Sequence, residues 1–376
     1  MKTILHIIKK EFLQFKRDPK MFMMILVAPV VQLTFLGYAA NLDVDKVHTA
    51  IFDQDKTATS RNYIEKFKGS GYFTFDYYVN NYDELQDKID NGKVILGLVI
   101  KKGFEEKINR RETADLQAIF DGSDGNTASI AAGYVQSVTT NFSRNTVTQY
   151  LDRMGRKVKP VGSVTAETRV WYNPELKTRV FMVPGIVGLL LMIITLILTS
   201  LAIVKEKEIG TLEQLIVTPI KPIQLIIGKL IPFAMLGFVS VIIIINAMAI
   251  IFDITVRGSI IFLFASTFVY ILSTLGLGLF VSTISKTQQQ AMMLAIFVIM
   301  MPMVYLSGFA FPIENMPKFI QYITYLIPLR YFMTIIRGII LKGIGFADLW
   351  PNLVALFVIG ISILSLSALR FRKRLD

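Results

Sequence analysis

The run Val180–Val204, VFMVPGIVGLLLMIITLILTSLAIV, contains no charged residue in 25 positions. A helix rises about 1.5 Å per residue, so about 20 apolar residues are enough to cross the hydrocarbon core of a bilayer, which is roughly 30 Å thick. This run is therefore predicted to be a transmembrane helix, and it places the chain among membrane proteins.

Five further uncharged runs lie on either side of it. They are Met21–Ala40, Leu230–Phe252, Ser259–Ser285, Ala291–Phe311 and Leu353–Leu369. We therefore expect a polytopic α-helical membrane protein with six transmembrane helices, residues 180–376 supplying five of them. The first run, residues 21–40, is longer than the apolar part of a signal peptide, about 7–15 residues, and is predicted to be an uncleaved anchor.

The distribution of charge predicts the orientation. Of the 376 residues, 53% are hydrophobic and 18% charged, and the net charge is +12. Residues 41–179 carry 20 basic and 19 acidic side chains, whereas the rest of the chain carries 20 basic and 9 acidic. The basic excess thus flanks the apolar runs, as the positive-inside rule requires of cytoplasmic ends. Both termini, including the basic tail, are predicted to be cytoplasmic, and a nucleic-acid partner is not expected.

One apolar segment does not fit a simple crossing. Residues 319–341 contain Pro328, Arg330 and Arg337, and a central arginine costs about 2.5–3.5 kcal/mol on insertion scales. A seventh crossing would also move the basic tail outside. Residues 313–349 are therefore predicted to form a broken, re-entrant or interfacial segment on the outer side.

Residues 41–179 are predicted to form a mixed α/β domain outside the cytoplasm. Strand patterns and helical patterns alternate there, which indicates a sheet covered by helices. The expected strands are 47–52, 73–79, 94–100 and 116–120, with a return strand near 164–172. The expected helices are 59–68, 82–91, 104–110 and 127–154.

The chain lacks the sequence features of ATP hydrolysis or metal chemistry. A phosphate-binding loop needs a glycine five residues before Gly-Lys and a hydroxyl residue after it, and neither Gly92-Lys93 nor Gly228-Lys229 has them. There is no cysteine, and the two histidines, His6 and His48, fall on opposite sides of the membrane in this topology. No catalytic, metal or cofactor-binding residue is predicted, so the chain is not expected to be an enzyme.

The six apolar runs also contain no Asp, Glu, Lys or Arg, the residues with which ion-driven transporters usually bind a coupling ion. Any uphill transport must therefore be powered by another subunit. Some polar side chains in the runs are candidates for a translocation path, although hydrogen bonding between helices is the favoured explanation for them. They are Thr199, Ser240, Asn246, Ser273 and Thr274.

Two cytoplasmic elements are candidates to receive that energy. Residues 1–20 have the pattern of an interfacial amphipathic helix on membrane lipid, with an apolar stripe of Ile4, Leu5, Ile8, Phe12 and Phe15 opposite Lys9, Lys10 and Lys16. The second element is the charged loop 205–219. There Thr211 is placed to cap a short helix that carries Glu213 and would suit a groove on a partner.

The order of several short motifs resembles the type-two permeases of ATP-binding cassette (ABC) exporters, in the branch with a large extracytoplasmic domain. The motifs are Lys10-Glu11, Arg17-Asp18-Pro19, Asp121-Gly122-Ser123, Trp171-Tyr172-Asn173-Pro174, Glu206 to Pro219, Leu275-Gly276-Leu277-Gly278, Leu306-Ser307-Gly308-Phe309 and Tyr325-Leu326-Ile327-Pro328-Leu329-Arg330-Tyr331. Each is weak alone, but together they cover nearly the whole chain.

The resemblance implies a bacterial inner-membrane permease that exports drug-like or amphipathic, lipidic compounds. It implies a second permease copy or paralogue and two copies of a separate ABC ATPase, which would bind the ATP and Mg. The residues expected to couple the permease to the ATPase are Glu11, Arg17, Asp18, Glu206, Glu208, Gly210, Thr211, Glu213 and Pro219. The sequence leaves open whether a periplasmic adaptor or an outer-membrane channel takes part. The alternative is a membrane-anchored receptor that acts through its outer domain.

Overall fold

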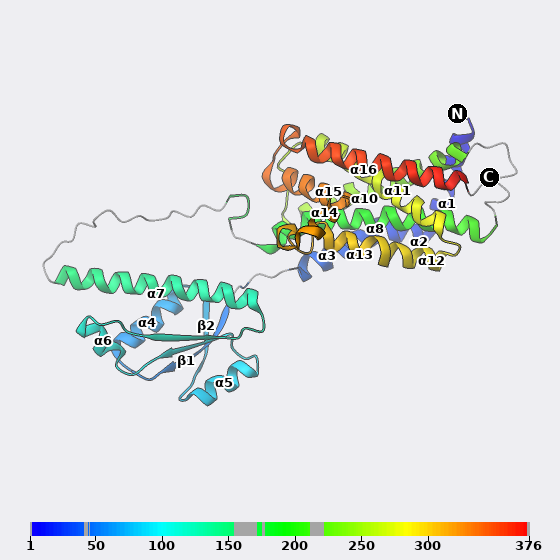
Figure 1. Ribbon diagram of the computed structural model, residues 1–376. Helices are drawn as coiled ribbons and strands as arrows, with labels where there is room; N and C mark the ends of the chain where they lie inside the picture. The colour runs from blue at the N-terminus through cyan, green and yellow to red at the C-terminus, as the bar shows by residue number, and fades with distance from the viewer. Residues whose placement is uncertain are drawn as a thin grey trace. The chain divides into compact units, whose positions relative to one another are not determined.

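The computed structural model describes residues 2–40, 44, 46–153, 171–174, 177–210 and 222–373. The chain divides into two compact units (Figure 1). Met1–Asn41 and Arg169–Asp376 form the first, called here the helical unit. Leu42–Thr168 forms the second, called here the α/β unit.

The helical unit is a bundle of long apolar helices. They are α8 (Thr178–Glu208), α10 (Pro222–Phe252), α11 (Ile260–Ile284), the continuous stretch of α12 (Gln288–Met293), η2 (Leu294–Met300) and α13 (Met301–Leu306), and α16 (Phe346–Lys373). In the described part of the chain, five helices are long and apolar enough to cross a membrane, or six if one bent pair is a single span. The predicted class, a polytopic α-helical membrane protein, is confirmed.

The first predicted span is helical and contains a π-helical turn. It consists of α2 (Pro19–Phe22), the π-helical turn η1 (Met23–Val27) and α3 (Ala28–Ala39). Asp18 Oδ1 accepts a hydrogen bond from Met21 N at 3.3 Å, and Pro19 stands where a helix can spare an N–H. The apolar part, Met23–Ala39, is shorter than the five long helices. The predicted count of six spans stays a prediction.

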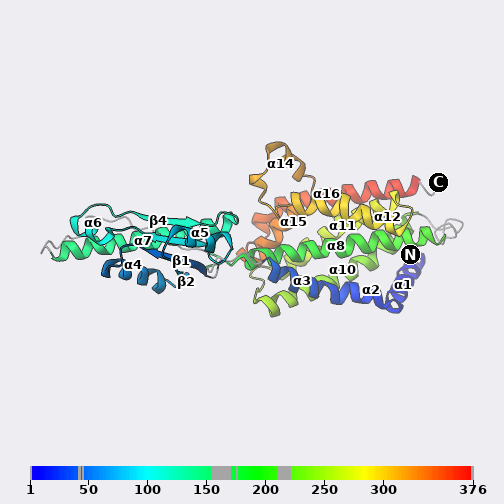
Figure 2. The ribbon, with the colours of Figure 1, turned by 90° about the horizontal axis from the view of Figure 1, so that it is seen from below.

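Helix α8 is the centre of the bundle, and the helices around it are more exposed (Figure 2). It packs closely on α11 because Gly278 has no side chain: a Cβ there would lie 2.7 Å from Thr199 Cβ and 2.9 Å from Leu196 O. The stretch α12–α13 and α16 expose most of their apolar surface instead. Apolar surface of that extent suits contact with lipid or with a second membrane subunit.

The segment that was predicted to be broken is broken. Helix α14 (Lys318–Thr324) and α15 (Pro328–Arg337), which continues into the π-helical turn η4 (Gly338–Lys342), are bent by 82° at the break. Ile327 is extended there and Pro328 starts α15, as expected where proline cannot continue the preceding helix. The predicted placement of this segment on the outer side stays a prediction.

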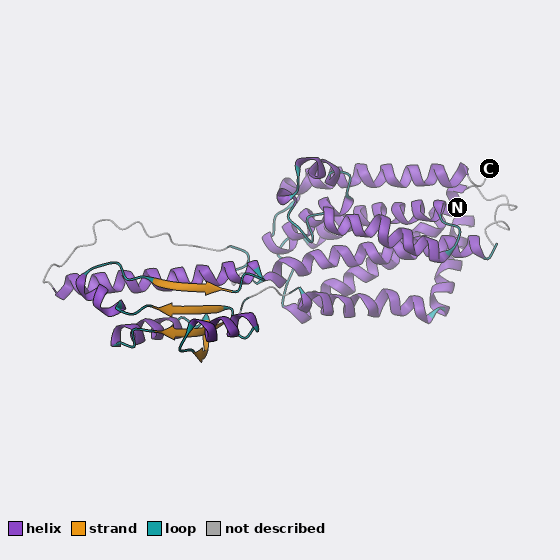
Figure 3. Cartoon of the chain, turned by 60° about the horizontal axis from the view of Figure 1, so that its bottom comes forward, coloured by secondary structure: helices purple, strands orange, loops and turns teal. Residues whose placement is uncertain are grey.

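The α/β unit holds a four-stranded sheet in the order β2-β1-β3-β4 (Figure 3). The strands are β1 (Val47–Asp53), β2 (Phe73–Tyr78), β3 (Leu96–Ile100) and β4 (Leu116–Phe120). Strand β1 pairs parallel with β2 and β3, and β4 pairs antiparallel with β3. The predicted α/β pattern is found here, but residues 154–170, with most of the predicted return strand, lie outside the described residues.

Helices cover both faces of this sheet. Helices α4 (Ala58–Gly69), α6 (Phe104–Arg110) and α7 (Gly125–Arg153) share one apolar core with Ile51 and Leu98. Helix α5 (Tyr82–Asp90) covers the other face, with Leu85 packed against Val99. Gly97 permits this approach, because a Cβ at that position would lie 2.8 Å from Leu85 Cδ1.

Candidate functional site

Helix α1 (Lys2–Arg17) packs against α10 at one end of the bundle, the end at which α8 and α16 finish (Figures 1 and 2). Ile7 is buried at this contact, where a Cβ on Gly228 would lie 2.8 Å from Ile7 Cγ2. Of the predicted apolar stripe, Leu5 is 68% exposed, while the face packed against α10 includes Ile7 and Glu11. Contact of the stripe with membrane lipid stays a prediction.

Four charged side chains meet where α1 packs against α8 and α10. Glu206 Oε1 of α8 lies 2.6 Å from Lys10 Nζ of α1, and Glu206 Oε2 lies 2.7 Å from Lys229 Nζ of α10. Lys229 Nζ is also 3.3 Å from Glu11 Oε1, which lies 3.9 Å from Lys10 Nζ. Each carboxylate therefore faces two ammonium groups. We call Lys10, Glu11, Glu206 and Lys229 the α1–α8–α10 ion-pair cluster.

Three of these four side chains are buried. The side chains of Lys229, Glu11 and Glu206 are 2%, 7% and 10% exposed, whereas that of Lys10 is 45% exposed. Buried charges are tolerable when they are paired, and removing one partner typically costs about 3–5 kcal/mol because the other is left uncompensated. The cluster therefore ties α1 to α8 and α10 in one arrangement, and movement of α1 would have to break or exchange ion pairs.

The end of α8 makes further polar contacts with the turn between α11 and α12. Lys207 Nζ donates to Ser285 O at 2.7 Å, and Glu208 Oε2 accepts from Gln288 Nε2 at 2.8 Å. The predicted loop 205–219 was thus wrong at its start, because α8 continues to Glu208. Gly210 follows with a φ of +79°, a conformation that favours glycine.

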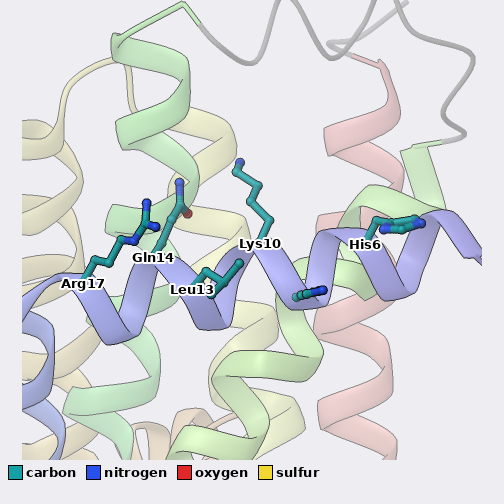
Figure 4. Close-up of a pocket in the computed structure, with 6 residues that line it drawn as sticks. His6, Lys10, Leu13, Gln14 and Arg17 are labelled. Carbon is teal, nitrogen blue, oxygen red and sulfur yellow. The ribbon is translucent and has the colours of Figure 1, made fainter.

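The remaining residues that were predicted to couple the permease to an ATPase, where the structure describes them, do not form one site. Thr211, Glu213 and Pro219 lie outside the described residues. Asp18 caps the start of α2, as described above. Arg17 lines a shallow hollow of about 330 Å³ along α1 with His6, Lys9, Lys10, Leu13 and Gln14 (Figure 4). Three of those six residues are lysine or arginine, so this exposed face of α1 suits an acidic surface.

Four of the five candidate path residues are fully buried in the helix packing: Thr199, Ser240, Ser273 and Thr274. The fifth, Asn246, is exposed and donates to Ile242 O at 2.7 Å. Thr274 Oγ1 accepts from Thr195 at 2.7 Å. Ser240 donates to Ile25 O in η1, at 3.1 Å. Such contacts favour hydrogen bonding between helices, and a role in a translocation path stays a prediction.

Lys229 and Lys10 are the members of the cluster that the sequence did not assign. The uncharged run Leu230–Phe252 begins directly after Lys229, so the absence of charge excludes this lysine from the predicted span. The structure has it inside α10, two turns from the start of the helix. A single lysine within the apolar run Pro222–Phe252 was the signal, since ionisable residues in such runs are usually functional. Among the described residues, no group of three His, Asp or Glu could hold a metal.

Comparison with known proteins places this geometry in context. A family model described as ABC-2 family transporter protein matches residues 19–369. The chain is 33% identical to "Probable multidrug ABC transporter permease YbhS" of Escherichia coli K12, over 98% of this chain and 96% of that protein. It is 32% identical to "Probable multidrug ABC transporter permease YbhR" of the same organism, over 98% of both. "Inner membrane transport permease YhhJ" is 26% identical over 86% of this chain and 84% of its own length.

Proposed function

The chain belongs to the ABC-2 family of transporter proteins, and from that premise we propose how this permease is powered and what it carries. It is the transmembrane subunit of an ABC exporter. Its energy comes from a separate cytoplasmic ABC ATPase in two copies, which binds the ATP and Mg, and it works with a second permease copy or paralogue. Its relatives with about one third identity are named for multidrug transport, which supports drug-like or amphipathic cargo.

The α1–α8–α10 ion-pair cluster is the observation that carries this proposal. The ATPase docks on the exposed basic face of α1 and on the segment after Glu208, at the cytoplasmic end of the bundle. Movement of α1 then reaches the membrane through Glu206, which belongs to the most buried helix of the bundle, and through Lys229. Buried ion pairs suit such a switch because they favour discrete arrangements over gradual ones.

We place both termini in the cytoplasm of a bacterial cell, with the permease in its inner membrane and the α/β unit outside. The basic excess around the apolar helices supports this orientation. Within its described residues, the helical unit has no feature that favours the alternative of an anchored receptor, since an anchor needs neither a bundle nor the buried cluster.

Purification and reconstitution test the proposal. The permease alone should hydrolyse ATP no faster than background, and a tagged permease from its host should retain an ATPase subunit. In proteoliposomes with that ATPase, Glu206→Gln should lower ATP-dependent uptake of an amphipathic dye at least about tenfold. The substitution removes the carboxylate charge that pairs with both Lys10 and Lys229. Glu314→Gln, at an exposed carboxylate outside the cluster, is the matched control and should leave dye uptake unchanged. Normal dye transport by Glu206→Gln would contradict transmission through the cluster.

A further inference from the structure

Arg337, the last residue of α15, places its guanidinium against the first turns of α8. Nη1 donates to Gly308 O at 3.0 Å. Cζ lies 3.8 Å from the centroid of the Phe181 ring. These two contacts fix both the plane and one end of the guanidinium group. Phe181 and Glu206 are 25 residues apart on α8, about 38 Å along the helix, so Arg337 and the ion-pair cluster lie toward opposite ends of α8.

The other edge of this guanidinium is unsatisfied. Arg337 Nε and Nη2 are both buried, and neither has a hydrogen-bond acceptor within the described ranges. Buried polar groups are almost always hydrogen-bonded, and buried charges are almost always paired. Arg330 in the same helix is the contrast, because it donates to Thr324 Oγ1 and Gln321 O and stacks on Tyr325.

Nε and Nη2 lie along one edge of the planar group, and each has one N–H that points out from this edge. This edge can donate two parallel hydrogen bonds to a carboxylate or a phosphate, the strongest pairing available to arginine. Gly185 allows α8 to approach this edge closely, since a Cβ there would lie 3.2 Å from Nη2. We propose that the Nε–Nη2 edge of Arg337 is a binding site for the oxyanion of an amphipathic molecule.

The edge is covered in this conformation, so the oxyanion enters when its neighbours move. Phe309 is next to Gly185, where a Cβ would lie 2.9 Å from Phe309 Cδ2. It follows Gly308, whose φ of +79° marks a turn that other residues rarely adopt. Displacement of this turn would free the edge and also the Gly308 carbonyl. The oxyanion is a phospholipid phosphate or the acidic group of a cargo, and only the cargo source rests on the proposed export function.

Amphipaths with one chain and different head groups test the site without any ATPase. The full-length permease in neutral detergent is heated with dodecyl phosphate, dodecanoate or dodecyltrimethylammonium. The two anions should raise the melting temperature, because a ligand that binds the folded state stabilises it, and the cation should not. Arg337→Gln should abolish the rise, and Arg337→Lys should weaken affinity at least about tenfold through loss of the bidentate geometry. Arg330→Gln is the matched control and should keep the rise.

Further experiments distinguish a phospholipid from a cargo as the source of the oxyanion, and a second variant covers the case in which the first does not fold. A phospholipid seen by native mass spectrometry on the wild type and lost in Arg337→Gln assigns the lipid source. Binding of the anions with no retained lipid assigns a cargo. Should Arg337→Gln fail to fold, Gly185→Ala crowds the same edge without removing its charge, and should weaken anion binding. Equal binding by wild type and variants overturns the proposal. So does a loss of permease dimers with probe binding unchanged, which would assign the edge to a contact between copies.

Discussion

Lys229 has an ammonium group that is almost fully buried between the carboxylates of Glu11 and Glu206. Replacing it with methionine keeps the apolar stem and leaves two buried carboxylates with one ammonium. We expect Lys229→Met to destabilise the permease by about 3–5 kcal/mol, measured by thermal or denaturant unfolding in detergent. Lys10→Met should cost about 1 kcal/mol or less, because the Lys10 side chain is 45% exposed. Adding Glu206→Gln to Lys229→Met should recover part of the loss; equal costs for the two lysines would contradict the cluster.

The hydrogen bonds of Asp55, two residues after the end of β1, predict that the stability of the α/β unit depends on pH. Burial raises the pKa of the Asp55 carboxyl, but hydrogen bonds from Thr57 and from the N–H groups of Glu105, Gly103 and Phe104 outweigh it and leave the pKa below its ordinary value. The carboxylate therefore stabilises α6 fully above its unfolded pKa, about 3.9, and this stabilisation is lost as pH falls through the lowered folded pKa.

The matching variant is Asp55→Ala. At pH 7 it should lower the free energy of unfolding by about 1–2 kcal/mol, as removal of a helix cap does. The difference in unfolding free energy from wild type should shrink as the solution is acidified below about pH 4. Thermal unfolding followed at a series of pH values measures both. Asp83→Ala, in the first turn of α5, is the control on the same unit. A difference that persists unchanged at pH 2 would show that Asp55 acts through its shape and not its charge.

At the scale of elements, the contact between α1 and α10 depends on the missing side chain of Gly228. A Cβ there would lie 2.8–2.9 Å from Ile7 atoms, too close unless the helices separate. Gly228→Val should therefore loosen α1, and amide hydrogen exchange over residues 2–17 should accelerate while α11 is unchanged. Gly133→Ala in α7 is the control, since no atom lies within 4 Å of its Cβ position. It should be neutral or stabilise by about 0.5–1 kcal/mol.

The elements themselves could be predicted where one local rule decides them. Strand β3 has five buried positions and reads as a continuous apolar run, and the break before Pro328 follows from the lack of an N–H. The end of α8 could not be predicted, because Glu206 and Lys207 read as a solvated loop. Their charges are satisfied by Lys10, Lys229 and Ser285, which are distant in sequence. The sequence therefore predicts half of the cluster: it indicates Glu11 and Glu206, but not the two lysines that pair with them.

At the scale of the whole molecule, α8 carries a charged site toward each end. Its last turns hold Glu206 in the ion-pair cluster, and its first turns hold Phe181 and Gly185 against Arg337. Between them the helix is apolar and mostly buried, with threonine hydroxyls such as Thr195 bonded to its neighbours. Under the proposed function, a displacement at one end of this buried helix would reach the other end, which coupling of ATP hydrolysis to export requires.

The topology of the whole chain is the final prediction, and the absence of cysteine makes it directly testable. Gln14, Asn80 and Glu314 are exposed in the structure, and each is replaced in turn by a single cysteine. An impermeant thiol reagent is then applied to intact cells. Asn80→Cys should react, because the α/β unit is placed outside. Glu314→Cys should react too, since four predicted spans lie between the two positions. Gln14→Cys should be shielded until the cells are permeabilised.

Arg374→Cys decides how the bent pair α14–α15 sits in the membrane. If the pair is re-entrant, one crossing by α16 returns the chain to the cytoplasm, and residue 374 should be shielded. A full crossing by the pair would place it outside, where the basic tail would oppose the positive-inside rule and both Arg330 and Arg337 would lie within a span. Reaction at Arg374→Cys in intact cells, with Glu314→Cys also reactive, would therefore establish a crossing. It would also move Arg337 from an outer segment to the interior of the membrane, where an unpaired guanidinium edge would need its oxyanion more strongly still.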